Sequence, residues 1–118
     1  PRQSSVDRIK AFALEFPDAW FDTPWEGDGV VKVGKKIFVF IGGPVSDAVA
    51  VKLPHSGEQA LLIEGAVPTP YGLGRHGWVT VPIARPDSPP VEVVCDFVEE
   101  SYRAVAPKRL IARLDDDG

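Results

Sequence analysis

The strongest structural signal in this sequence is a β-hairpin. Two apolar segments, Val30–Val33 and Lys36–Ile41, are separated by Gly34 and Lys35. A two-residue loop with glycine first is typical of a type II′ turn, whose twist matches that of the flanking strands. We therefore predict an antiparallel strand pair over residues 30–41, which the following Gly-Gly-Pro ends.

Apolar spacing predicts further helices and strands around this hairpin. Helices are expected over residues 4–16, 56–63 and 89–105, with a last short helix from Pro107, and strands over 48–53 and 78–83. Ser4, Ser56 and Ser88 are the predicted N-terminal caps, the first two within capping boxes that include Asp7 and Gln59. The segments rich in turn-forming residues are predicted to be irregular: residues 20–29, 67–77, 84–90 and 115–118.

The order of these elements predicts an α+β fold. Hairpins occur without a regular βαβ alternation, which favours an antiparallel sheet with helices packed on one face, a two-layer sandwich. No internal repeat or long linker is visible, and 118 residues suit one hydrophobic core. We expect a single domain over residues 1–118.

Composition limits the location and chemistry of the protein. The chain is 44% apolar and 25% charged, lacks a run of about 18 apolar residues, and begins without a signal-peptide pattern. A soluble cytoplasmic protein is expected, and the single Cys95 fits a reducing compartment. One cysteine and two histidines do not suffice for a structural zinc site. The net charge of −4 is mildly unfavourable for approach to a polyanion.

No catalytic pattern stands out, so we expect neither an enzyme nor a cofactor. Gly72, Gly74 and Gly77 spell G-x-G-x-x-G, but the motif precedes a predicted strand, whereas a dinucleotide-binding motif follows one. Cys95 lies on the apolar side of its helix and is expected to be a buried, inert thiol. Two kinds of polar residue are expected at the solvated surface: the histidines His55 and His76, and the adjacent carboxylates Glu99 and Glu100.

Basic residues offer a more suggestive pattern. Lys32, Lys35 and Lys36 gather at the hairpin turn, Lys52 lies in the next strand, and Arg75 lies in the glycine-rich loop. A lysine-tipped hairpin can follow a phosphate backbone, although lysines at strand edges also keep sheets soluble. The aromatic residues of neighbouring segments could belong to the core or form a stacking platform: Trp20, Trp25, Tyr71 and Trp78.

Five short motifs together resemble one known family. They are V-x-V-x-x-K-I-F in the hairpin, V-K-L at residues 51–53, P-x-P-Y at 68–71, G-W-V-T-V at 77–81 and E-E-S-Y at 99–102. In this order they resemble the MmcQ/YjbR family of small bacterial proteins. The resemblance implies a fold similar to secretion chaperones and loosely to frataxin-like proteins, and a proposed "double wing" role in DNA binding. The matching positions are Lys36, Lys52, Trp78, Ser101 and Tyr102.

These observations lead to one expected function and leave two alternatives open. The resemblance implies a non-enzymatic DNA-binding protein that binds weakly and without sequence preference, and we expect its contacts at Lys32, Lys35, Lys36, Lys52, Arg75 and Trp78. Ser101 and Tyr102 are expected to hold the long helix against the sheet. The alternatives are a protein-interaction or chaperone-like module, monomeric or weakly dimeric, that uses apolar surface near Trp20, Trp25 and the Pro-rich loop, and a small-molecule site at the glycine loop.

Overall fold

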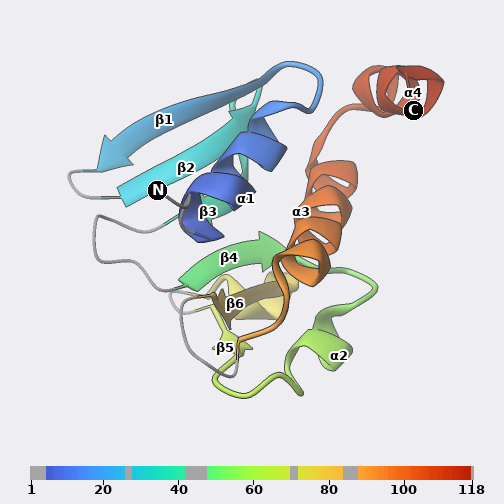
Figure 1. Cartoon of the computed structure of the whole chain (residues 1–118). Helices are drawn as coiled ribbons and strands as arrows, with labels where there is room; N and C mark the ends of the chain where they lie inside the picture. Colours follow the sequence, from blue (N-terminus) through green and yellow to red (C-terminus); the bar gives the residue numbers. More distant parts are fainter. Residues whose placement is uncertain (1–4, 26–27, 42–47, 70–71, 84–87, 118) are drawn as a thin grey trace.

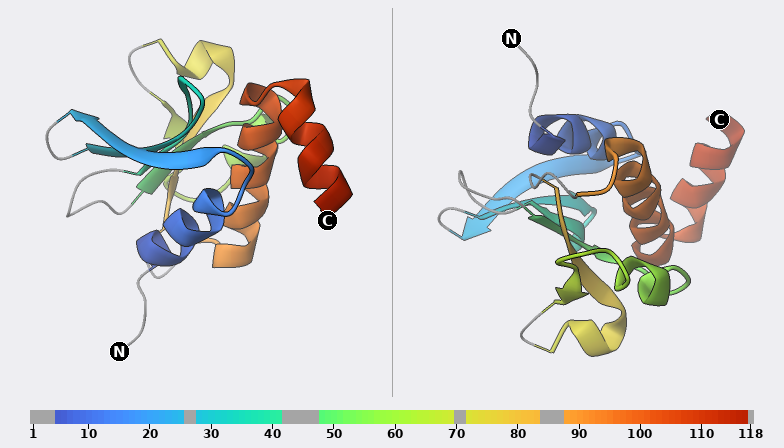
Figure 2. Two further views of the ribbon diagram at one scale, coloured as in Figure 1. Left: turned by 90° about the horizontal axis from the view of Figure 1, so that it is seen from above. Right: turned by 60° about the horizontal axis from the view of Figure 1, so that its bottom comes forward.

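The protein forms one six-stranded antiparallel sheet with helices packed on one face (Figure 1, Figure 2). The computed structural model describes residues 5–25, 28–41, 48–69, 72–83 and 88–117. The elements in chain order are α1 (Ser5–Leu14), β1 (Ala19–Trp25), β2 (Asp28–Val33), β3 (Lys36–Ile41), β4 (Ala48–Lys52), α2 (Gly57–Ala60), β5 (Val67–Pro68), the 3₁₀ turn η1 (Gly74–His76), β6 (Trp78–Pro82), α3 (Val91–Val105) and α4 (Lys108–Asp117). The strand order is β1-β2-β3-β4-β6-β5. This architecture confirms the predicted α+β class.

The predicted hairpin is confirmed. Val33 pairs with Lys36 across the turn, and Gly34 has a φ of 62°, a left-handed conformation that glycine adopts without steric cost. A bulge that the sequence did not predict shifts the register between Val31 and Lys32, so that β3 carries one extra residue, Phe38. The bulge places Phe38 and its neighbour Val39 together in the core.

Strand β1 was missed, and the prediction of an irregular segment over residues 20–29 was wrong. Its Asp and Pro residues disfavour strands, whereas its aromatic residues and Thr favour them, and Trp20, Phe21 and Asp22 pair in register with β2. Pairing with β2 outweighs the unfavourable strand preference of Asp22 and Pro24. Pro24 is tolerated because β1 lies at the edge of the sheet, where one side needs no ladder hydrogen bonds.

Several predicted boundaries need correction. The helix expected over residues 56–63 is limited to α2, and Ser56 makes no capping hydrogen bond. The loop expected over 67–77 contains β5 and η1, because Val67 pairs with Thr80 of β6. Helix α3 begins at Val91 after Pro90, not at a Ser88 cap. Asp115, expected in a solvated tail, belongs to α4, whereas Ser4 and residues 84–87 lie outside the described residues.

The core lies between the sheet and the helices α1 and α3. Alternate residues of the strands point into it, together with Ile9 of α1 and Val94 and Val98 of α3. Phe16 stacks on Tyr102 with ring centroids 4.7 Å apart, and Phe38 meets both rings edge to face. No helix in the described parts of the chain is long and apolar enough to cross a membrane.

Candidate functional site

The E-E-S-Y motif of α3 joins the helix to three other segments. Ser101 donates a hydrogen bond to the Phe38 carbonyl and accepts one from the Lys52 amide at 2.9 Å, so its hydroxyl links β3 to β4 beside the bulge. The Tyr102 hydroxyl donates to the Pro17 carbonyl at 2.7 Å. The structural role predicted for both residues is confirmed.

Glu100 also has a structural role, which corrects the prediction of a solvated carboxylate. Its side chain accepts hydrogen bonds from the backbone amides of His55 and Ser56, both at 2.9 Å, and from the Ser56 hydroxyl at 2.6 Å. Burial opposes ionisation of this carboxyl, but these hydrogen bonds outweigh burial and lower the pKa of Glu100. Ser56 therefore binds α3 instead of capping α2.

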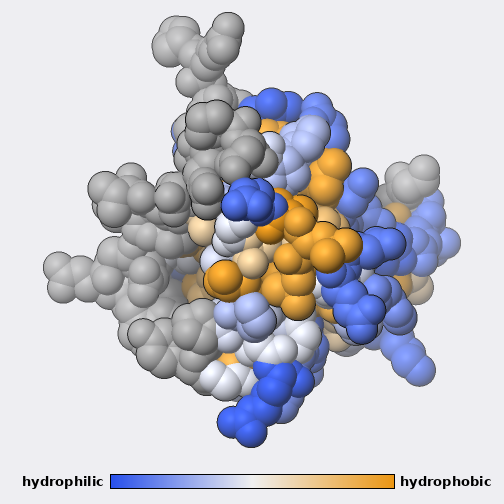
Figure 3. All heavy atoms as spheres, turned by 90° about the horizontal axis from the view of Figure 1, so that it is seen from below, coloured by the Kyte–Doolittle hydropathy of each residue, from blue (hydrophilic) through white to orange (hydrophobic). Residues whose placement is uncertain are grey.

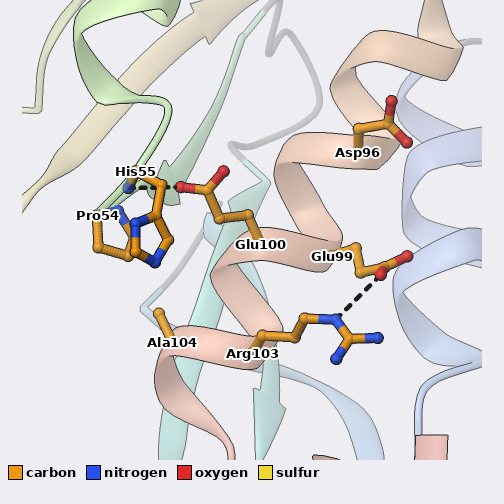
Figure 4. Close-up of a pocket in the computed structure, with 7 residues that line it drawn as sticks. All are labelled: Pro54, His55, Asp96, Glu99, Glu100, Arg103 and Ala104. Carbon is orange, nitrogen blue, oxygen red and sulfur yellow. Dashed lines mark hydrogen bonds and ion pairs between the residues drawn. The ribbon is translucent and has the colours of Figure 1, made fainter. Parts of the chain in front are cut away.

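A hollow of about 430 Å³ lies between α3 and Pro54–His55 (Figure 4). Two of its carboxylates have partners within the protein: Glu100 points toward the backbone of His55, and Glu99 pairs with Arg103 at 3.0 Å. Asp96 also lines the hollow. Within the described residues, no group of three or more His, Cys, Asp and Glu side chains is placed to hold a metal ion.

The glycine-rich loop owes its glycines to the path of the backbone. Gly72 and Gly77 have φ values of 81° and 91°, in the left-handed region that favours glycine. A Cβ atom on Gly74 would lie 2.8 Å from Pro68 Cβ. A neighbouring hollow of about 450 Å³ includes Trp78 in its lining. The lining of this hollow does not include His76 or Lys52.

Cys95 is half-buried on α3. Burial raises the pKa of its thiol. Nearby charges have smaller effects: Arg8 lowers this pKa, and Asp96 and Glu92 raise it. A raised pKa keeps the side chain in its less reactive thiol form at neutral pH. This environment agrees with the predicted inert role.

The sheet register brings Lys32, Lys36, Lys52 and Trp78 to one end of the strands. Lys36 follows the turn that ends β2, and Lys52 is paired with Trp78 where β4 ends and β6 begins. Lys32 is paired with Trp20 of β1 at the same end of the sheet. Side chains on directly paired residues share a face, so Trp20, Lys32, Lys52 and Trp78 all lie on the face opposite α1 and α3.

The predicted binding residues differ in how far their side chains are exposed to solvent. Trp78 is only 8% exposed and packs edge to face against Phe40, with ring centroids 5.3 Å apart. Lys52 is half-buried, whereas Lys35, Lys36 and Arg75 are exposed. Trp78 therefore serves the packing of the sheet and has little ring surface left for a ligand.

Trp20 of β1 presents an exposed aromatic side chain at this end of the sheet. It is 44% exposed, and its indole Nε1 donates a hydrogen bond to the Gly34 carbonyl at 2.9 Å. The Lys32 Nζ lies 5.1 Å from the centroid of the ring and 2.8 Å from Asp22 Oδ2. The hydrogen bond from Lys32 lowers the pKa of the Asp22 carboxyl. The side chain of Trp25 and the whole of Tyr71 lie outside the described residues.

Two arginines of α4 complete this end of the molecule, and the sequence analysis missed them. A groove of about 340 Å³ separates α4 from the hairpin turn, and its lining includes Trp20, Gly34 and Arg109. Arg113 lies four residues further along the helix and, like Arg109, approaches Asp18. The R-x-x-x-R spacing indicates a shared helix face. The sequence does not indicate that this helix face lies beside the hairpin, because only the tertiary structure brings the two together.

Comparison with known proteins places this fold. A family model described as YjbR matches residues 14–104. The chain belongs to the YjbR family. Protein DR2400 of Deinococcus radiodurans, whose family-model domain is DUF419, has a similar crystal structure, with a TM-score of 0.73 and 24% identity over 90% of this chain and 80% of that chain. This likeness confirms the YjbR-type fold, and no curated protein matches.

Proposed function

We propose that this YjbR protein binds DNA weakly and with little sequence preference, through the sheet edge around Trp20, without enzymatic activity. The observation that carries the proposal is an exposed indole held rigidly beside Lys32 and the lysine-bearing turn. Cations that approach phosphates release counterions, and exposed aromatic rings stack on bases of any sequence. Both contributions are independent of sequence.

The residues that we propose as contacts differ in exposure and in their partners within the protein. Lys35 and Lys36 are exposed at the turn and are the strongest candidates for phosphate contacts. Lys32 shares its charge with Asp22, which reduces its attraction for a phosphate. Lys52 and Trp78 support the surface from within the sheet. Arg75 is exposed in the loop before β6, and we assign it a peripheral contact.

Fluorescence anisotropy of labelled DNA at several salt concentrations tests this proposal. We expect affinity to fall steeply with salt, and Lys36→Gln to reduce the slope of log K against log salt by about 0.9 for duplex DNA, the value of one lost phosphate contact. Arg8→Gln, on the exposed side of α1, removes one positive charge elsewhere and serves as the matched control. Binding that ignores salt, or an equal loss in both variants, contradicts the proposal.

A second candidate function is self-association, a form of the protein-interaction module, and one observation favours it. An apolar patch lies on the underside of the molecule, where α2 and β5 are found (Figure 3). Its exposed side chains include Leu62 at 85% and Val67 at 50%, beside the hollow of about 450 Å³ that Leu61 lines. Such exposure is typical of contact surfaces between proteins.

Analytical ultracentrifugation over a range of protein concentrations distinguishes this candidate. A second copy of the chain that buries the patch would give concentration-dependent association, and Leu62→Ser would abolish it because a polar side chain replaces the most exposed apolar one. A monomer at every concentration, or association unchanged in Leu62→Ser, removes self-association through this patch from consideration.

A further inference from the structure

Helix α4 forms one wall of a groove whose other wall is the start of β1 and the hairpin turn. The helix lies beyond residues 14–104, the part of the chain that the YjbR family model matches. It stands outside the layer of α1 and α3 at one end of the molecule (Figure 1, Figure 2). The groove of about 340 Å³ has Asp18 and Trp20 on one side and Pro107, Arg109 and Leu110 on the other.

Trp20 provides a fixed apolar surface in this groove. The hydrogen bond between its indole Nε1 and the Gly34 carbonyl, 2.9 Å long, ties one edge of the ring to the hairpin turn. The ring is nevertheless 44% exposed. An oriented and accessible ring stacks on a base with little loss of conformational entropy. Only an unpaired base has its faces free for such stacking, which favours a single strand over a duplex.

Two guanidinium groups face one carboxylate beside this ring. Arg109 Nη1 lies 3.9 Å from Asp18 Oδ2, and Arg113 Nη1 lies 3.8 Å from Asp18 Oδ1. Both distances exceed hydrogen-bond length. The three side chains are 73%, 59% and 50% exposed in the order Arg109, Arg113, Asp18, so these ion pairs are weak and easily replaced.

The position of Asp18 is set by the backbone rather than by the arginines. Asp18 has a φ of 60°, and the flanking residues are held by hydrogen bonds from Ala19 to the Phe16 carbonyl and from Tyr102 to the Pro17 carbonyl. The carboxylate is thus presented to both guanidinium groups at distances too long for good pairing. A backbone phosphate also carries one negative charge on two non-bridging oxygens, but a free strand can position it for the shorter, bidentate contacts with arginine that the fixed Asp18 carboxylate does not make.

We propose that Arg109, Arg113 and Trp20 form a subsite for one nucleotide of a single-stranded nucleic acid, which Asp18 partly occupies in the free protein. This inference rests on the proposed function and names its preferred substrate class. The two guanidinium groups bind the phosphate, the indole stacks on the base, and Asp18 acts as an internal competitor. The subsite depends on α4, so it lies outside the part of the chain that the family model covers.

Anisotropy with labelled oligo-dT and with a duplex of equal length tests the subsite. We expect oligo-dT to bind more tightly than the duplex, and the double variant R109Q/R113Q to lose affinity and reduce the salt slope for oligo-dT by about 1.4, the value of two phosphate contacts on a single strand. The variant R109K/R113K keeps both charges but lacks the bidentate fork, so we expect an intermediate affinity.

Asp18→Asn provides the most specific readout. Asparagine tolerates a positive φ, so the backbone is retained while the competing charge is removed. We expect severalfold tighter binding of oligo-dT. Glu58→Gln, which neutralises one exposed carboxylate on α2 at the far end of the molecule, controls for the change in net charge and should have a much smaller effect.

The outcomes separate this inference from the proposed function. If oligo-dT binds wild-type protein and Lys36→Gln weakens binding, but R109Q/R113Q and Asp18→Asn behave as wild type, the subsite is wrong and the proposed function stands. Equal effects of Asp18→Asn and Glu58→Gln, or tighter binding of the duplex, also overturn the subsite. If neither oligo-dT nor the duplex binds wild-type protein at low salt, the proposed function and the subsite are both wrong. Circular dichroism of each variant confirms that it is folded.

Discussion

Ser101 shows how one side chain joins a helix to a sheet. Its hydroxyl lies between the Lys52 amide and the Phe38 carbonyl, next to Val39 and Val51, where the pairing of β3 with β4 ends. The hydroxyl thus satisfies two backbone groups beside the bulge, in a fully buried position. Removing one partner from a buried hydrogen bond leaves the other without compensation for its lost water.

Ser101→Ala should therefore destabilise the fold strongly for so small a change. We expect a loss of about 2 kcal/mol in the free energy of unfolding, since two buried backbone groups lose their partner. Urea denaturation followed by circular dichroism measures it. Glu99→Ala in the same motif removes only an exposed pair with Arg103 and should cost about 0.5 kcal/mol or less. Equal costs would show that the hydroxyl bridge contributes nothing.

Glu100 predicts a pH dependence of stability. The pKa of its carboxyl is below the ordinary 4.5 in the folded protein, because the hydrogen bonds from Ser56 and His55 outweigh burial. Such a group contributes stability that is fully present above pH about 4.5 and is lost as the pH falls through the folded pKa. Glu100→Gln should be less stable than wild type by about 1.5 kcal/mol at pH 7, a value typical of a partly exposed charged hydrogen bond.

The stability difference between wild type and Glu100→Gln should shrink as the pH falls below about 4.5. Urea midpoints of both proteins, measured between pH 3 and pH 7 at intervals of about half a pH unit, give the stability difference as a function of pH. A difference that stays constant down to pH 3 would show that charge at Glu100 does not contribute to folding.

At the level of elements, the charged side chains of α4 are arranged unfavourably for its helix dipole. Lys108 and Arg109 lie in its first turn, next to the positive end, and Asp115 and Asp116 lie near its negative end. A helix of this kind gains little stability from its own sequence. It is held by the buried Leu110 and by the ion pair between Arg103 and Asp115, 2.7 Å long.

Leu110→Ala should therefore release α4 while the sheet stays folded. We expect faster amide hydrogen exchange in residues 110–117 and unchanged protection in β3 and β4, because Leu110 is the buried apolar contact of α4 and Leu114 packs against the core only partly buried. Lys108→Ala, at an exposed position of the same helix, should leave the exchange rates of α4 unchanged or lower. Loss of protection throughout the sheet would show that α4 unfolds only with the whole protein.

At the scale of the whole molecule, charge is distributed unevenly. The chain carries a net charge of −4, yet Lys35, Lys36, Arg109 and Arg113 gather around Trp20 at one end. Local potential rather than net charge governs the approach of a polyanion. The net charge that appeared unfavourable in the sequence is therefore compatible with an anion-binding surface.

Retention on a heparin column tests this asymmetry. At pH 7 and about 0.01 M ionic strength, where the Debye length is about 30 Å, we expect wild-type protein to be retained despite its acidic composition. R109Q/R113Q should elute at lower salt than wild type, whereas Arg8→Gln on α1 should change elution much less. Wild-type protein that passes through unretained would show that the cationic end is too weak to overcome the net charge.

Local sequence chemistry determined the hairpin, the long helix and the fold class. Gly34 at the turn and the apolar face of α3 are local signals, and short-range steric preference and burial were sufficient to interpret them. The family motifs also identified Ser101 and Tyr102 as structural. The lysines were visible in the sequence as a cluster at the turn, although their exposure was not.

Only the tertiary structure decided that β1 is a strand, which tryptophan is exposed, and where α4 lies. Strand β1 pairs with β2 although Asp22 and Pro24 interrupt its strand-favouring residues with turn-forming ones. Trp20 and Trp78 belong to the same sheet face, yet packing against Phe40 buries Trp78 while Trp20 stays exposed. Arg109 lies beside the hairpin because Leu110 docks α4 there, a contact between residues far apart in the chain. Such long-range contacts leave no periodic signal in the sequence.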